Sequence, residues 1–265
     1  GAFCRAMLEN WSLGKLGSVR RWRQGMILRP RALDTGKWWD RPWSLVDGCN
    51  PVSDGCVHCW SAAMARRFKL DWTPRFRADR LDIPLRTRKP AVWAVWNDLF
   101  HTRVSNEQIA QAFGVMATAK RHYFMVLTKR PRRMGPFVDW IRRDTRAGFC
   151  SAWPPPNVAL GVTVESQEHV HRVGALLEAW PGLTFLSVEP MLGPVDIGLY
   201  GVNLVIAGGE SGPGARPMDL DWARRLRDQC AAAGAPFLLK QIGPDRRSGR
   251  ALDGREHNGW FGDKA

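Results

Sequence analysis

The stretch Tyr123-Phe124-Met125-Val126-Leu127-Thr128 is the clearest strand in this sequence, and Lys129-Arg130-Pro131 follows it directly. An apolar run without polar alternation is typical of a strand in a parallel sheet that is covered on both faces. Pro131 suits the first turn of a helix, because its φ is already fixed and it has no N–H to leave unpaired. A buried strand followed by a helix is one unit of a parallel α/β fold.

The same unit recurs along the chain, with short β-branched or aromatic runs alternating with segments of helical periodicity. We predict strands at Trp43–Asp47, Ala91–Trp96, Tyr123–Thr128, Val158–Val164, Thr184–Val188, Leu204–Ala207 and Pro236–Lys240, with a weaker one at Leu81–Leu85. We predict helices at His58–Lys69, Asn106–Lys120, Pro131–Arg143, Gln167–Trp180 and Asp221–Ala233. The connection from Glu189 to Val202 is short and rich in Gly and Pro, so one helix is expected to be missing there. The repetition predicts an α/β fold: a full or partial (β/α) TIM-like barrel of parallel strands.

The chain divides into three segments on this basis. Residues 41–245 are expected to form the barrel, and residues 246–265 form a polar, glycine-rich tail that we expect to be irregular. Residues 1–40 do not follow the repeat, and we expect a basic extension over the barrel. That extension carries arginines and tryptophans that include Arg20, Arg21, Arg23, Arg29, Arg31, Trp11 and Trp22.

Composition favours a basic protein without a membrane anchor. The 265 residues carry a formal net charge of +14, and no stretch approaches the ~20 apolar residues that span a bilayer. The first ten residues lack the pattern of a secretion signal, so a cytoplasmic protein is expected. The excess of positive charge favours polyanions such as nucleic acid or phosphorylated substrates. A basic surface without such a partner is the alternative, because arginine far outnumbers lysine.

Three cysteines, Cys49, Cys56 and Cys59, lie within eleven residues of one another. The C-x2-C pair lets two thiolates converge, and the loop before it contains the Pro and Gly needed to bring the third thiolate back. A closed zinc site or an electron-transfer cluster usually takes four protein ligands. Three ligands leave one position open, as in a reactive site. The alternative is a structural zinc site in a nucleic-acid-binding module, completed by His58 or a distant cysteine.

Polar residues follow the predicted strands at the point where each ends. In a parallel barrel these positions lie at one mouth, where the reacting groups of such enzymes are found. They are Asn97, Asp98, Thr128, Lys129, Arg130, Glu165, Glu189, Gly208, Gly209, Glu210, Ser211, Lys240 and Gln241. Any one of them could instead be a helix cap or a solvated loop residue. Together they also allow a hydrolase or lyase that uses Asp98, Glu165 and Glu189 as acid and base.

Two of these groups suggest ligand binding. Glycines at 208 and 209 permit close approach of a ligand to the backbone, and the Glu210 carboxylate can accept hydrogen bonds from an amine. Lys129 and Arg130 precede a helix N-terminus, which is a favourable place for a carboxylate or phosphate.

The order of these short motifs resembles a phage- and prophage-associated family of uncharacterised three-cysteine proteins, related to the radical S-adenosylmethionine (SAM) enzymes. The likeness extends over roughly residues 40 to 256. It rests on six segments: 43–60, 97–101, 127–131, 187–190, 208–212 and 240–241. Two features depart from the commonest radical SAM pattern: the first cysteine gap is six residues rather than three, and Gly-Gly-Glu follows a late strand.

The resemblance implies a partial barrel that holds a [4Fe-4S] cluster on Cys49, Cys56 and Cys59. The open iron would bind SAM, and an electron from the cluster would cleave it to a radical that abstracts hydrogen from the substrate. It assigns substrate chemistry to Glu165, Glu189 and Lys240. The residues expected to bind SAM or substrate are Gly208, Gly209, Glu210, Ser211, Asn97, Asp98, Thr128, Lys129 and Arg130. The charge suggests that the substrate is a nucleic acid or nucleotide undergoing modification or repair, and the resemblance suggests a companion protein encoded nearby.

Overall fold

The computed structural model describes residues 27–143, 153–212, 214–245 and 248–264. Arg20, Arg21, Arg23, Trp11 and Trp22 of the predicted N-terminal extension therefore lie outside the described residues, as do Cys4 and Cys150.

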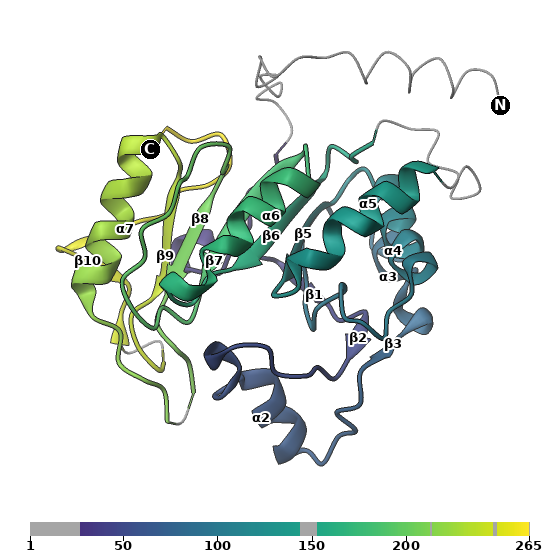
Figure 1. The fold of residues 1–265 in the computed structure, drawn as a ribbon, viewed down its shortest axis with the longest axis horizontal. Coiled ribbons are helices and arrows are strands. Elements are labelled where there is room, and N and C mark those ends of the chain that lie inside the picture. Colours follow the sequence, from purple (N-terminus) through teal and green to yellow (C-terminus); the bar gives the residue numbers. More distant parts are fainter. Residues whose placement is uncertain (1–26, 144–152, 213, 246–247, 265) are drawn as a thin grey trace.

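A single curled sheet of seven parallel strands forms a half-barrel (Figure 1). The strands are β1 (Arg41–Trp43), β4 (Val92–Val95), β5 (Tyr123–Thr128), β6 (Val158–Thr163), β7 (Leu183–Val188), β8 (Val205–Gly208) and β9 (Phe237–Gln241). They are hydrogen-bonded in the order β1-β4-β5-β6-β7-β8-β9, and every pair is parallel. The predicted partial barrel is confirmed.

Helices between successive strands cover the outer face of the sheet (Figure 1). They are α3 (Ile83–Arg86), α4 (Asn106–Thr118), α5 (Met134–Arg143), α6 (His171–Ala179) and α7 (Leu220–Ala233). Ser105 and Gln108 form the expected capping box at the start of α4, and Gly234 ends α7 in the left-handed conformation. The chain between β7 and β8 contains no helix, as its Gly and Pro content predicts.

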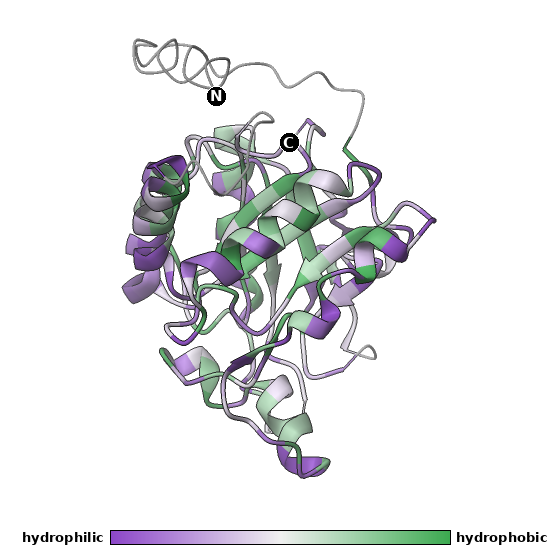
Figure 2. Ribbon diagram, turned by 90° about the vertical axis from the view of Figure 1, so that its right-hand side faces the viewer, coloured by the Kyte–Doolittle hydropathy of each residue, from purple (hydrophilic) through white to green (hydrophobic). Residues whose placement is uncertain are grey.

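Short elements complete the chain. They are the 3-10 helices η1 (Leu33–Thr35), η2 (Asp54–Cys56), η3 (Ala78–Arg80), η4 (Pro131–Arg133) and η6 (Gln167–His169), and the two-residue strands β2 (Val46–Asp47), β3 (Arg75–Phe76), β10 (Ala251–Leu252) and β11 (Arg255–Glu256). The remaining helix, α2 (Trp60–Arg67), follows the cysteine loop. Two views at right angles place it beyond one end of the sheet, apart from the helices that cover the outer face (Figures 1 and 2).

The strands bury side chains on both faces, which explains their unbroken apolar sequences. One cluster lies between the sheet and the outer helices, and includes Phe124, Val126 and Leu160. A second cluster fills the concave interior, where Met125 and Phe185 alternate with the outer set.

Three predicted segments differ from the structure. Trp43–Asp47 is not one strand, because the chain turns after Trp43 and β2 pairs with β3 in a separate antiparallel sheet. Leu81–Leu85 is not a strand: it leads into α3, where Pro84 takes a first-turn position that suits its fixed φ. The tail is not irregular throughout, because β10 pairs with β11.

The tail also belongs to the interior of the barrel. Trp260 and Phe261 are 2% and 5% exposed and pack in the interior cluster with Trp38, from the segment before β1. Segments before β1 and after β9 therefore cover the concave face that the seven strands leave open.

Candidate functional site

The cysteine loop, residues 48–59, lies between β2 and α2 at the carboxyl ends of the parallel strands. Its entry is fixed by Asp47, which accepts hydrogen bonds from Arg77 (2.6 Å) and Arg80 (2.8 Å). Gly48 follows with a φ of +68°, and a Cβ there would lie 2.0 Å from the Trp72 carbonyl oxygen. Only glycine fits this turn.

Two of the three thiols lie beside cations from the end of β5. Arg130 Nη1 is 3.6 Å from Cys49 Sγ, and Lys129 Nζ is 3.6 Å from Cys56 Sγ. Burial raises the pKa of Cys49 above its ordinary value, against the opposing effect of Arg130. Burial also acts to raise the pKa of Cys56. Lys129 and hydrogen bonds from the loop outweigh it, so the net pKa of Cys56 is lowered. All three thiols, including Cys59, are partly exposed and reduced.

Glu165, two residues after the end of β6, ties the cysteine loop to the barrel. Its side chain is fully buried, and its oxygens lie 2.5 Å from Lys129 Nζ and 2.7 Å from Arg172 Nη1. Ser53 of the cysteine loop donates its hydroxyl to the same carboxylate. Desolvation acts to raise the pKa of Glu165, but Lys129, Ser53 and Arg172 hold it below its usual range. Glu165 is therefore an ionised anchor, with the opposite of the raised pKa that a general acid needs.

A second anchor is Asp98, after β4. It accepts hydrogen bonds from Thr128 Oγ1 (2.5 Å) and Arg130 Nη1 (2.7 Å), and from the Lys129 backbone N–H. The preceding Asn97 donates to the Val46 carbonyl. Both Asn97 and Asp98 have positive φ values, 57° and 47°, which this residue type tolerates better than most. The bent backbone thus directs the Asn97 side chain to β2 and the Asp98 side chain to the end of β5.

Glu189 and Lys240 form an ion pair across the mouth, with Glu189 Oε1 3.0 Å from Lys240 Nζ. Ser187 donates to the other carboxylate oxygen at 3.3 Å. Lys240 Nζ also lies 5.9 Å from the centre of the Trp39 ring. Lys240 is 26% exposed and Glu189 11%, so this pair is more open to a ligand than Glu165 is.

The space beside the strand-end glycines, Gly208 and Gly209, is occupied by other atoms of the protein. A Cβ on Gly209 would lie 2.1 Å from the Ile242 carbonyl oxygen, and one on Gly208 2.9 Å from a Glu189 oxygen. Both glycines thus allow close packing of the chain end of β8 against the segment around β9. Ser211 lies next in the same loop and is partly exposed.

Glu210 is occupied by Arg216. The Arg216 guanidinium donates to both of its oxygens, at 2.5 and 2.9 Å, and the Arg216 backbone N–H donates at 2.9 Å. Arg216 also donates to the Asp54 carbonyl, and His58 Nδ1 lies 3.7 Å from Glu210. The buried carboxylate therefore clamps the cysteine loop from the β8 side and is not free for an amine while Arg216 remains in place.

The structure brings the predicted residues to one mouth in three connected groups: Cys49 with Arg130, Asp98 and Thr128; Cys56 with Lys129 and Glu165; and Glu189 with Lys240. Arg172 and Arg216 are the partners that sequence reasoning missed, as is Ser53. Arg172 lies in the first turns of α6 and resembles a solvated helix residue in sequence, yet it is 4% exposed. No local signal distinguishes it.

The ligand geometry of the site differs from that of a single-ion centre. Within the described ranges, no three His, Cys, Asp or Glu side chains converge to bind one metal ion. A zinc ion needs donors within about 2.0–2.3 Å of a common point. An iron–sulfur cube instead takes each thiolate on a different iron, so three spaced thiols on one loop fit its donor set. Cys230 is unsuited to either role, because burial in α7 raises the pKa of its thiol to about 12.

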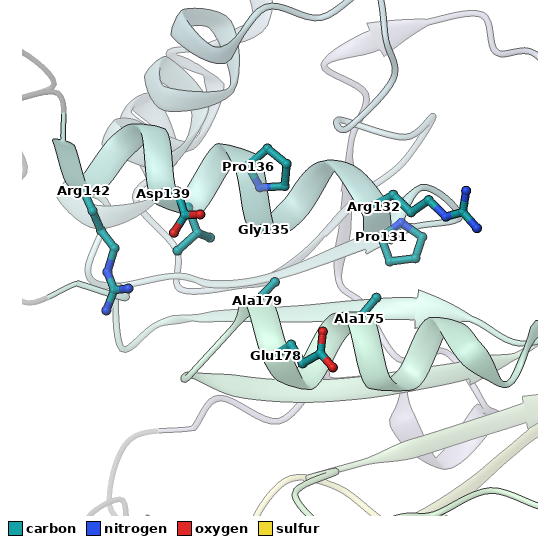
Figure 3. Close-up of a pocket in the computed structure, with 10 residues that line it drawn as sticks. Pro131, Arg132, Gly135, Pro136, Asp139, Arg142, Ala175, Glu178 and Ala179 are labelled. Carbon is teal, nitrogen blue, oxygen red and sulfur yellow. The ribbon is translucent and has the colours of Figure 1, made fainter. Parts of the chain in front are cut away.

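A groove of about 290 Å³ lies elsewhere, on the outer layer between α5 and α6. Pro131 and Arg132 line one end of it, Arg142 lines the other, and Glu178 of α6 lies between them (Figure 3). It contains none of the predicted site residues.

A family model described as "Protein of unknown function (DUF5131)" matches residues 35–261. The searches of curated proteins and of solved structures found no match to the chain. Among the helices that the structure describes, none has both the length and the apolar character required to cross a bilayer.

Proposed function

The chain belongs to the family of proteins of unknown function DUF5131, and we propose that this member is a radical SAM-type iron–sulfur enzyme. The observation that carries the proposal is the cysteine loop at the mouth of a parallel half-barrel, with three reduced, partly exposed thiols and a cation beside two of them. Cys49, Cys56 and Cys59 would hold a [4Fe-4S] cluster and leave one iron for SAM. When bound, such a cluster would supply the electron for reductive cleavage of SAM, so that a hydrogen atom can be removed from the substrate.

The residues around the loop have roles that suit this chemistry. Lys129 and Arg130 offset the negative charge of the thiolates, and Asp98 and Glu165 hold those two cations in position. Glu189 and Lys240 form the partly exposed ion pair on the other side of the mouth, where they would contact SAM or substrate. The positive charge of the chain supports a nucleic acid or nucleotide as the substrate. A reducing, cytoplasmic setting suits the free thiols.

The environment of the carboxylates argues against acid–base hydrolysis. Asp98 and Glu165 are buried against guanidinium or ammonium groups, and Glu165 has a lowered pKa. A hydrolase acid at this mouth would need a carboxyl that stays protonated near neutral pH.

The proposal is tested by purifying the chain without oxygen and measuring iron, acid-labile sulfide and zinc. Bound iron and sulfide in the ratio of a [4Fe-4S] cluster are expected. With dithionite and SAM the protein should release 5′-deoxyadenosine, and release should rise when DNA, RNA or a nucleotide pool contains the substrate.

Cys56→Ala should lose the iron and the SAM cleavage while its far-ultraviolet circular dichroism stays that of the wild type. The matched control is Cys230→Ala, which removes a core thiol and should keep both. A colourless wild type with one zinc per chain and no sulfide would contradict the proposal.

A further inference from the structure

The exposed apolar residues of this protein are concentrated on one element. Eight large apolar residues are exposed in the described part of the chain, and six lie between residues 52 and 70. They are Val52, Val57, Trp60, Met64, Phe68 and Leu70, with 43–64% of their surface exposed, whereas Leu85 and Tyr200 lie elsewhere. Scattered single apolar residues are normal on a surface, but a contiguous group marks an interaction site.

Four of the six form a row along α2, which we name the α2 stripe: Val57, Trp60, Met64 and Phe68. Trp60, Met64 and Phe68, the C-cap of α2, are spaced four residues apart and therefore lie on one side of the helix, and Val57 lies in the cysteine loop three residues before the helix begins. The adjoining side of the helix carries small residues: Ala65 is 4% exposed, and Ser61 donates to Asn97, just after β4. Trp60 contacts Trp96 edge-on, with 5.8 Å between the ring centroids, yet half of its surface stays exposed, as does about half of Met64 and Phe68. The helix therefore leaves its large apolar residues half-exposed while a small one, Ala65, is buried, unlike an ordinary surface helix. Folding of this chain alone does not account for that arrangement.

The stripe is bordered by positive charge. Arg66, Arg67 and Lys69 are exposed and form no ion pair with the residues that the structure describes, and α2 itself contains no Asp or Glu. Figure 2 shows the hydrophilic end of this helix at the bottom of the molecule, beyond its hydrophobic length. A partner for this surface would offer apolar contacts ringed by carboxylates.

The position of the stripe indicates what such a partner would do. Trp60 directly follows Cys59, and Val57 lies between Cys56 and Cys59, so the stripe begins within the cysteine loop. A protein seated on it would lie against the half-exposed thiols at the side away from the barrel. In the enzyme proposed above, the group held by these thiols must receive one electron from outside before each cleavage of SAM.

We infer that the α2 stripe is the docking surface for a small acidic electron-transfer protein, of the ferredoxin or flavodoxin type. This inference rests on the proposed function. At the interface the donor would be oxidised by one electron, and a cluster held by Cys49, Cys56 and Cys59 would be reduced by that electron, with no bond formed or broken and no proton transferred. Single-stranded nucleic acid fits the surface less well, because Val57 and Met64 give a base no ring to stack on, and the Trp60 ring already packs edge-on against Trp96, with 5.8 Å between the ring centroids. Methionine, aromatic rings and arginine together are typical of the centre of protein interfaces.

The test compares two reductants on the same variants. Met64→Glu and Phe68→Glu place like charge opposite an acidic partner on exposed positions that should not disturb folding. Reduction by dithionite needs no docking, and the rate of SAM cleavage with it should stay within about twofold of wild type. Reduction by a purified acidic ferredoxin or flavodoxin should need about tenfold more donor, the effect of losing one well-packed interface residue. Tyr200→Glu, an exposed apolar residue outside the stripe, is the matched control and should behave as wild type with both reductants.

Binding provides a readout that does not depend on turnover. Titration calorimetry should detect binding of either acidic donor to the wild type. The binding should weaken as salt rises from about 50 to 200 mM, and the affinity of Met64→Glu should be about tenfold lower. Cytochrome c, which is small but basic, should not bind.

Stripe variants that keep wild-type affinity and donor dependence would overturn the inference. So would wild type that binds neither donor, or variants that lose affinity for a single-stranded oligonucleotide instead. Dithionite-driven cleavage that survives in any of these cases leaves the proposed enzyme standing without this surface. Protein without iron and sulfide would instead refute the enzyme itself.

Discussion

Replacement of Glu165 by glutamine should destabilise the protein far more than its single atomic change suggests. Glu165 is fully buried, and its carboxylate is shared by Lys129 at 2.5 Å, Arg172 at 2.7 Å and the Ser53 hydroxyl. In Glu165→Gln the side-chain shape is kept, but an amide N–H₂ replaces one oxygen and faces a cation. Removing one partner of a buried ion pair costs about 3–5 kcal/mol.

The two cations would respond differently to the loss. Lys129 is 21% exposed and can be partly hydrated, whereas Arg172 is 4% exposed and has the Thr163 carbonyl as its other partner among the described residues. We therefore expect the lower end of the range, ~3 kcal/mol, which corresponds to a fall in Tm of roughly 6–12 °C for a chain of this size.

The assay is thermal unfolding followed by far-ultraviolet circular dichroism, with iron content measured on the same samples. The matched control is Glu189→Gln, which removes a carboxylate paired, within the described part of the chain, with the 26%-exposed Lys240, and a loss of about 1 kcal/mol or less is expected. Iron content should fall in Glu165→Gln because the cysteine loop loses its tie through Ser53. If Glu165→Gln unfolds within about 1 kcal/mol of wild type, Glu165 is not the anchor described here. Loss of activity alone would then point to a catalytic carboxylate.

Further predictions follow from single positions. Gly209→Ala should lower the free energy of unfolding by about 2 kcal/mol or more, because its Cβ would lie 2.1 Å from the rigid Ile242 carbonyl. Gly114→Ala, in α4 with open space around it, should instead raise that free energy by about 0.5–1 kcal/mol, and urea unfolding of the two variants checks both signs. His122 is a buried neutral ring whose Nδ1 accepts from the Ala91 N–H, and burial lowers its pKa. As the pH falls below about 6.5, His122 is therefore protonated in the unfolded chain before it is protonated in the folded protein. The stability that the neutral ring contributes is complete above that pH and is lost on acidification. His122→Gln should show a shallower loss of stability between pH 7 and pH 5 in urea titrations; an unchanged slope would mean that His122 does not titrate in this range.

The sequence predicts the barrel well because its strands are buried on both sides. Tyr123–Thr128 has the same bounds as β5, since no polar residue interrupts the run and the Lys-Arg-Pro that follows cannot continue it. The one weaker strand prediction, Leu81–Leu85, is wrong. Leu81–Leu85 is apolar enough for a strand, but Pro84 removes a ladder donor and favours the helical turn that forms.

The residues of the candidate site also fall into those that the sequence predicts and those that it does not. Residues that follow strands were found because the carboxyl ends of parallel strands share one edge of the sheet. Their partners were not, because Arg172 and Arg216 are brought to the mouth by tertiary packing from a helix and a loop. Glu210 shows the consequence: its position was predicted, but its saturation by Arg216 was not visible in the sequence. Trp260 gave a signal that was overlooked, since a tryptophan and a phenylalanine in a glycine-rich tail are seldom left in water.

Because Trp38 and Trp260 cover the concave face of the sheet, they determine when a nascent chain can complete its fold. Strands β1 to β9 can emerge from the ribosome and pair in sequence, but the concave face of the sheet stays exposed to solvent until residues near 260 have been synthesised. The nascent chain on the ribosome thus contains an almost complete sheet with an exposed apolar face, and chaperones act on such species. Stalling translation before and after that point should separate a chaperone-bound half-barrel from a protease-resistant one.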